Sequence, residues 1–136
     1  MCRHLFVYGT LHPNRAPSGV ANSMRRLCRV GAASVRGRLY DLGEYPGAVL
    51  DSSSDAVIAG EVFEVPDDPV VLQALDEYEG FDPSNLKASL FVRTACAVKL
   101  ADGRSLASWI YIYNQNLEAA PLIVGGDYLS LRTKKP

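Results

Sequence analysis

The strongest candidate for chemistry in this sequence is a carboxylate at the end of a short helical pattern. Pro69 stands at a helix-entry position, directly behind two aspartates. Leu72, Leu75 and Glu79 follow at spacings of three and four, so they share one stripe. Gly80 comes next, as a helix C-terminus requires. At that end the helix dipole and burial both raise the pKa of a carboxyl, and a group with a raised pKa can accept and return a proton.

The other carboxylates of this turn, Asp76 and Glu77, fall on different faces of the expected helix and are expected to be solvated. Glu79 itself has a second interpretation, as an exposed residue of the last turn, because glutamates are common on protein surfaces. The helical pattern alone leaves both interpretations open.

A second candidate stretch lies near the N-terminus. Residues 5–8 form a short apolar and aromatic run, typical of a buried strand, and Gly9 ends it. A glycine at a strand end lets the backbone approach a ligand closely, so that successive N–H groups can face a carboxylate or a developing oxyanion. The alternative is a plain strand that ends in a turn.

The composition excludes several classes of protein. At 136 residues with 48% hydrophobic content, the chain has the size of one globular domain, which we assign to residues 1–136. Its formal charge of −1 argues against nucleic acid and membrane surfaces as partners and favours a small neutral or zwitterionic ligand. The cysteines form neither a CxxC pair nor a Cys/His cluster, so we expect no metal and no cofactor.

The N-terminal residues contain no apolar signal segment, and no apolar run approaches transmembrane length. We therefore expect a cytoplasmic protein with reduced thiols. Cys96 falls on the apolar face of an alternating stretch, which indicates a core thiol rather than a nucleophile.

The elements that must position these candidates are mostly strands. Beyond residues 5–8, strand patterns cover residues 30–42, 48–50, 56–65, 91–100 and 105–114, while residues 20–28 suit a short helix. Trp109, Tyr111 and Tyr113 share one face and need cover. So many half-apolar strands with few helices predict an α+β domain whose sheet curls toward a barrel. A last strand-like piece at 128–131 is expected to open a mobile tail.

Five stretches taken together carry a family resemblance. Phe-Val-Tyr-Gly-Thr-Leu at residues 6–11 and Leu-Asp-Glu-Tyr-Glu-Gly at 75–80 are joined by residues 37–47, 60–65 and 102–113 in the same order. With them the chain resembles the gamma-glutamylcyclotransferase-like family, closest to its gamma-glutamylamine cyclotransferase branch. The resemblance implies a small mixed β-barrel flanked by a few short helices.

The resemblance also implies roles for single residues. Tyr8, Gly9, Thr10 and Leu11 would hold the substrate, and Glu79 would be the general acid/base that cyclises a gamma-glutamyl group to 5-oxoproline and releases its amine. Arg93 and Tyr113 are secondary candidates for the substrate site. Their alternatives are a surface charge and barrel packing.

A second function remains open at this point, a non-catalytic module that binds a small ligand or a partner on the same fold. A carboxylate kept at an unfavourable helix end favours the enzyme. The sequence leaves open which gamma-glutamyl compound is the substrate, and it leaves the oligomeric state open as well.

Overall fold

The computed structural model describes residues 3–9, 18–43, 45–117, 120–123 and 126. Thr10, Leu11 and the tail expected from about residue 128 lie outside these described residues. The elements in chain order are β1 His4–Val7, α1 Ser18–Arg25, β2 Cys28–Asp41, β3 Pro46–Leu50, β4 Val57–Glu64, α2 Pro69–Glu79, the single 3-10 turn η1 Leu86–Ala88, β5 Phe91–Leu100 and β6 Ser105–Tyr113.

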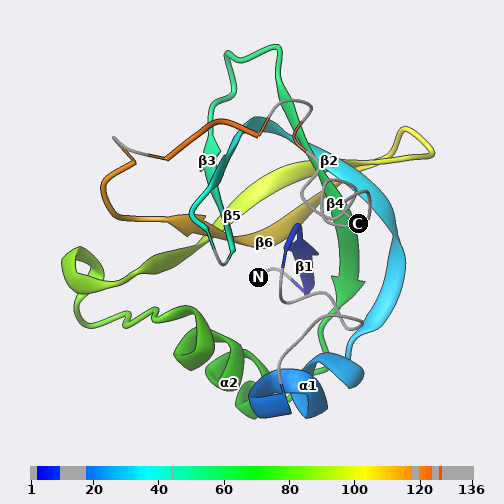
Figure 1. Ribbon diagram of the computed structural model, residues 1–136. Coiled ribbons are helices and arrows are strands. Elements are labelled where there is room, and N and C mark those ends of the chain that lie inside the picture. Colours follow the sequence, from blue (N-terminus) through cyan, green and yellow to red (C-terminus); the bar gives the residue numbers. More distant parts are fainter. Residues whose placement is uncertain (1–2, 10–17, 44, 118–119, 124–125, 127–136) are drawn as a thin grey trace, which may run out of the picture.

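The strands close into a mixed barrel (Figure 1). Their order in the sheet is β3-β2-β4-β1-β6-β5, and β2 pairs with β5 as well, through Ala33 opposite Leu100. Neighbouring strands run antiparallel, except β1 and β6, which run parallel. The C-terminal part of β2, residues 37–41, leaves the barrel and pairs with β3. The expectation of an α+β domain with a small mixed barrel is confirmed.

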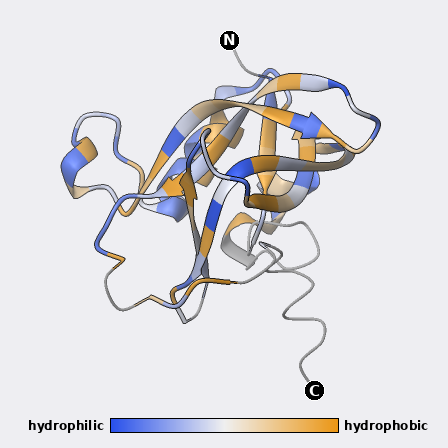
Figure 2. Cartoon of the chain, turned by 90° about the horizontal axis from the view of Figure 1, so that it is seen from above, coloured by the Kyte–Doolittle hydropathy of each residue, from blue (hydrophilic) through white to orange (hydrophobic). Residues whose placement is uncertain are grey.

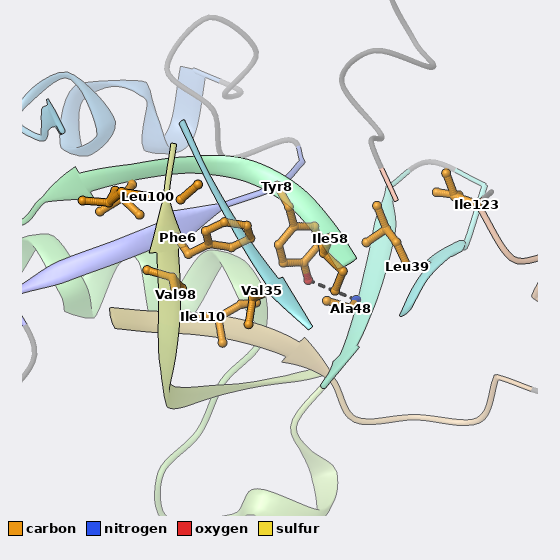
Figure 3. Packing of buried hydrophobic residues seen from close by; sticks show 12 residues of the cluster. Phe6, Tyr8, Val35, Leu39, Ala48, Ile58, Val98, Leu100, Ile110 and Ile123 are labelled. Atoms are coloured by element: carbon orange, nitrogen blue, oxygen red, sulfur yellow. Dashed lines mark hydrogen bonds between the residues drawn. The ribbon is translucent and has the colours of Figure 1, made fainter. Parts of the chain in front are cut away.

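One face of each barrel strand points inward and is apolar. Figure 2 shows hydrophobic and hydrophilic residues alternating along the strands, as the two-residue period of a strand requires. The inward side chains form a cluster that we call the barrel interior (Figure 3). Its buried members are Phe6, Tyr8, Ala33, Val35, Leu39, Ala48, Ile58, Val62, Val98, Leu100, Ile110 and Ile123. Cys96 packs half-buried against this cluster, as expected for a core thiol.

The outer face of the barrel is covered on one side by α1 and α2, which lie side by side (Figure 1). Their apolar residues and the outward residues of the strands form a second cluster, which we call the helix layer. Its buried members are Leu5, Val7, Val20, Met24, Leu27, Phe63, Val65, Val71, Leu75, Phe91 and Tyr111. Trp109 and Tyr113 pack against it, so the expected cover over the aromatic face of β6 is present.

Helix α2 begins and ends where its local signals indicate. Asp68 caps the N-terminus by accepting a hydrogen bond from the N–H of Val70 at 3.1 Å, and Pro69 occupies the first helical position. Gly80 ends the helix in the left-handed conformation, with φ of 70°. The Phe81 N–H then donates to the carbonyl of Asp76 at 2.8 Å, which closes the last turn. This cap fixes where Glu79 leaves the helix.

Candidate active site

A cavity of about 260 Å³ lies between the end of β1 and the C-terminal end of α2. Its wall contains both stretches that the sequence analysis singled out, since Gly9 and Glu79 each line it. The described lining consists of Phe6, Val7, Tyr8, Gly9, Tyr45, Pro46, Tyr78, Glu79, Leu90, Phe91 and Tyr111. Apart from Glu79, this described lining is apolar, aromatic or backbone, so the carboxyl faces a largely apolar space.

Burial raises the pKa of Glu79 to about 8. The hydrogen bonds found among the described residues do not include one to this carboxyl, so nothing in that part of the chain offsets the loss of water around the charged form. Glu79 is therefore largely protonated at neutral pH and is close to the point where it can exchange its proton. The geometry disagrees with the alternative of a fully solvated last-turn residue.

Tyr8 contributes its ring to the cavity, while its hydroxyl is engaged inside the protein. The hydroxyl donates to the carbonyl of Tyr111 at 2.5 Å and accepts from the N–H of Ala48 at 3.2 Å, the bond drawn in Figure 3. Burial raises the pKa of Tyr8 well above its ordinary value, and the nearby charge of Glu79 adds to this. Tyr8 thus stays neutral and ties the end of β1 to β3 and β6.

Gly9 is required by a close approach to Pro46. A Cβ placed on Gly9 would lie 2.7 Å from Cγ and 3.0 Å from Cδ of the proline ring, which is too rigid to move aside cheaply. Both residues line the cavity. Thr10 and Leu11, the other residues expected in this loop, lie outside the described residues, and their roles remain predictions.

The expectation that Asp76 is solvated is wrong, because this residue is only 9% exposed. Its Oδ1 accepts from Nε of Arg93 at 2.9 Å and from the Tyr111 hydroxyl at 2.6 Å, and its Oδ2 accepts from Nη2 of Arg93 at 3.2 Å. The helical pattern placed Asp76 off the apolar stripe, but the strands that pack there supply polar partners rather than water. Glu77 is exposed, as expected.

Arg93 and Tyr113, the secondary candidates, lie behind the cavity rather than in its described lining. The Arg93 guanidinium pairs with Asp76, 4.4 Å from the centroid of the Trp109 ring. The Tyr113 ring packs edge-on against Phe91, with centroids 5.4 Å apart. Arg93 is therefore a half-buried ion-pair partner and not the surface charge offered as its alternative.

Sequence reasoning missed the aromatic walls of the site. Tyr111 lines the cavity, and burial together with its hydrogen bond to Asp76 raises its pKa, so its hydroxyl stays a donor. Tyr45 and Tyr78 line the cavity as well. The alternating aromatics of β6 were a signal for Tyr111, although the pattern could not show that the row reaches a cavity.

Two further classes of site can be checked in the part of the chain that the structure describes. Within it, His, Cys, Asp and Glu side chains do not come together in a group that could hold a metal ion. Among the same residues, no helix is both long and apolar enough to span a membrane.

The chain is a closed mixed barrel in which the C-terminal end of a helix brings a carboxyl to the wall of a cavity. The family described as Gamma-glutamyl cyclotransferase, AIG2-like, matches residues 5–130, and this chain belongs to it.

Relatives support this assignment over nearly the whole chain. A Citrobacter rodentium protein named Gamma-glutamylcyclotransferase family protein ytfP is 28% identical over 126 residues, which cover 92% of this chain and 94% of the relative. An AIG2-like protein from Mus musculus has the same fold, with a TM-score of 0.73 at 24% identity over 98% of this chain and 90% of the other. YkqA from Bacillus subtilis matches with a TM-score of 0.71 at 23% identity, and this chain spans 44% of its length.

Proposed function

We propose that this protein is a gamma-glutamyl cyclotransferase, which cyclises the gamma-glutamyl group of a small amine or peptide to 5-oxoproline and releases the amine. The observation that carries the proposal is the position of Glu79, a carboxyl with a pKa raised to about 8, in the same cavity wall as the strand-end Gly9. Membership of the Gamma-glutamyl cyclotransferase, AIG2-like family supports the reaction class.

The proposed reaction needs one group that moves protons. The substrate's α-nitrogen attacks its own γ-carbonyl carbon, a ring C–N bond forms, and the C–N bond to the departing amine breaks. The α-ammonium first loses one proton to solvent, and the neutral amine attacks. The ionised Glu79 then takes one proton from the attacking nitrogen and returns it to the departing nitrogen, so the ring keeps one N–H and the amine is released neutral. A base works best when its pKa is near the operating pH, and an α-amino group ordinarily titrates at about 8, close to the pKa of Glu79.

Ring closure is intramolecular, so holding the substrate folded is a large part of catalysis. The cavity volume of about 260 Å³ suits one compact ligand. Phe6, Val7 and Phe91 supply apolar walls that favour the folded chain of methylenes over an extended one in water.

The ends of the substrate require polar contacts from the backbone. We propose that the N–H groups of the loop that starts at Gly9, with Thr10 and Leu11, hold the substrate carboxylate or the developing oxyanion. What supports this is the place of Gly9 in the cavity wall and its close approach to Pro46, which leaves no room for a side chain.

The test is release of 5-oxoproline from a panel of gamma-glutamyl amines, amino acids and peptides, with wild type compared to Glu79→Gln. The variant is nearly isosteric and cannot accept the proton, so its turnover should fall by about 10²–10⁴-fold while substrate binding survives. Glu77→Gln is the matched control, because it removes an exposed carboxylate from the same turn and should keep wild-type turnover.

Full activity of Glu79→Gln would remove the acid/base assignment. The alternative of a non-catalytic binding module predicts another result: members of the panel bind to the wild type, for instance by calorimetry, and none is converted to 5-oxoproline. The same preparation therefore distinguishes the enzyme from the module.

A further inference from the structure

The buried ion pair beside the cavity contains a second carboxyl of α2. Asp76 lies three residues before Glu79, so their side chains occupy neighbouring positions on successive turns. The carboxylate of Asp76 accepts three hydrogen bonds, two from the fork of Arg93 and one from Tyr111. The side chains of Arg93 and Asp76 are only 17% and 13% exposed. Bonds of this geometry, in which charges are paired and shielded, are strong and directional.

This network joins α2 to the sheet at one defined place. Arg93 on β5 and Tyr111 on β6 are direct partners in the strand register, so the hairpin presents both donors together. The carbonyl of Asp76 also accepts the N–H of Phe81 that closes the last turn of α2. Asp76 thus fixes the turn that carries Glu79 through its side chain and through its backbone.

The network also reaches a second part of the cavity wall. The Tyr111 carbonyl accepts a hydrogen bond from the hydroxyl of Tyr8, which lines the cavity together with Gly9. Displacement of Asp76 would therefore disturb both Glu79 and the part of the wall that contains Tyr8.

The second consequence of the pair between Asp76 and Arg93 concerns the charge of Arg93. The charges of Asp76, Arg93 and Glu79 all act on the Tyr111 phenol, so one side chain links the ion pair to Glu79. In the intact protein, burial is what raises the pKa of Glu79. An unpaired guanidinium at that place would favour the ionised form of Glu79, because an opposite charge nearby stabilises a carboxylate. The ionisable groups around Glu79 in the described residues are Asp76, Glu77 and Tyr78 on α2, Tyr8 after β1, Tyr45 before β3, Arg93 on β5 and Tyr111 on β6.

We propose that Asp76 is a positioning residue for Glu79, which fixes the last turn of α2 against the β5–β6 hairpin and cancels the positive charge of Arg93 beside the cavity. Only its effect on turnover rests on the proposed cyclotransferase function. Its effect on the carboxyl of Glu79 is a property of the protein without substrate.

The experiment is a titration of the Glu79 side-chain carboxyl by ¹³C NMR in four variants, together with kcat and KM for 5-oxoproline release. Asp76→Asn leaves Arg93 without its counter-charge and should lower the midpoint of the Glu79 titration from about 8. Arg93→Gln leaves the negative charge of Asp76 unpaired and should raise the midpoint, because a like charge disfavours the ionised form of Glu79. The double variant Asp76→Asn with Arg93→Gln removes both charges and should return the midpoint to near that of wild type. Tyr111→Phe removes a hydrogen bond but no charge, so it should lower kcat without moving the midpoint.

The matched control is Asp102→Asn, which breaks another Asp–Arg pair, an exposed one with Arg104 on the β5–β6 turn. It should leave the midpoint, kcat and KM at wild-type values. A purely structural role for Asp76 predicts lower stability in its variants but one common midpoint, and that result would overturn the proposal. A midpoint for Arg93→Gln that falls or stays unchanged would also overturn the proposal. This measurement does not depend on whether Asp76→Asn folds.

Failure of this inference differs from failure of the proposed function. Midpoints that shift as expected in a protein that releases no 5-oxoproline would support the positioning role and reject the cyclotransferase. Release of 5-oxoproline by variants whose midpoints do not move would support the cyclotransferase and reject the positioning role.

Discussion

The barrel interior and the helix layer are both closely packed, and they differ in what they do with polar groups. In the barrel interior the Tyr8 hydroxyl is buried, and it has both a hydrogen-bond donor and an acceptor as partners. Beside the helix layer, Asp76 and Arg93 form a partly buried ion pair, and one turn away Glu79 is half-buried and has no hydrogen-bond partner among the described residues.

The difference indicates a division of labour. The barrel interior is a closely packed frame of apolar side chains, while two carboxyls beside the helix layer have different surroundings: Asp76 is paired with Arg93, and burial raises the pKa of Glu79. The cavity lies where the two regions meet, since Phe6 and Tyr8 come from the interior and Val7, Phe91 and Tyr111 from the helix layer. The cavity to which we assign the proposed reaction is thus at the boundary between the two regions rather than inside the barrel.

The largest effect that would test this division is the pH dependence of kcat/KM. A base with a pKa near 8 is ionised about tenfold less for each unit below that value, so kcat/KM should rise about tenfold per unit from about pH 5 to pH 7 and bend near pH 8. Initial rates of 5-oxoproline release across this range measure it. A bend near the ordinary Glu value of about 4.3 would show that Glu79 is not in a dry environment.

Truncation of one apolar residue in each region compares the regions directly. Ile58 in the barrel interior and Leu75 in the helix layer are both fully buried, so each change to alanine should cost about 2–5 kcal/mol in the free energy of unfolding. Ile58→Ala should keep the pH midpoint and kcat of the folded protein, whereas Leu75→Ala, on the turn before Glu79, should alter both. Denaturant unfolding and initial rates measure these quantities, and identical kinetics in the two variants would contradict the division.

The third test concerns the free energy of unfolding of Glu79→Gln as a function of pH. The folded protein keeps a proton on Glu79 that the unfolded chain releases above about pH 4.3, so this carboxyl's contribution to stability is complete below that pH and is lost as pH rises to about 8. Gln stays neutral throughout. The variant should therefore gain on wild type by up to about 1.4 kcal/mol per pH unit between about pH 5 and pH 7, measured by denaturant unfolding.

Glu77→Gln is again the control for this experiment. Its exposed carboxyl should give a stability difference from wild type that is small and does not change with pH. If the free energies of unfolding of wild type and Glu79→Gln changed with pH in the same way, burial would not favour the neutral form of Glu79.

Features set by neighbours in the chain could be predicted from the sequence. Helix α2 shows this, because Pro69 and Gly80 determine its ends through local backbone geometry. The alternating strands and the need to cover the aromatics of β6 likewise follow from a pattern within each element. The same local features place Glu79 and Gly9 at the ends of their elements, and both residues line the cavity. Their roles in the site stay predictions.

What depends on distant partners could not be predicted. The helical pattern assigned Asp76 to solvent, since nothing near it in sequence shows that Arg93 and Tyr111 stand opposite. Nothing near Tyr8 in the sequence shows that strand order brings Tyr111 and Ala48 to its hydroxyl. The parallel pairing of β1 with β6 could not be predicted either, because the residue pattern within a strand does not depend on which strand pairs with it.

That parallel pairing has a consequence for how the protein is made. The first strand is central to the sheet, and the bond from Tyr8 to Tyr111 spans 103 residues. At a synthesis rate of about 5–20 residues per second, β6 is made roughly 5 to 20 s after β1. During that time β1 lacks one of its two neighbours in the sheet. Such high contact order slows folding. We expect the cavity to be the last part of the molecule to form and the nascent N-terminal strand to be the part most exposed to aggregation or to chaperones.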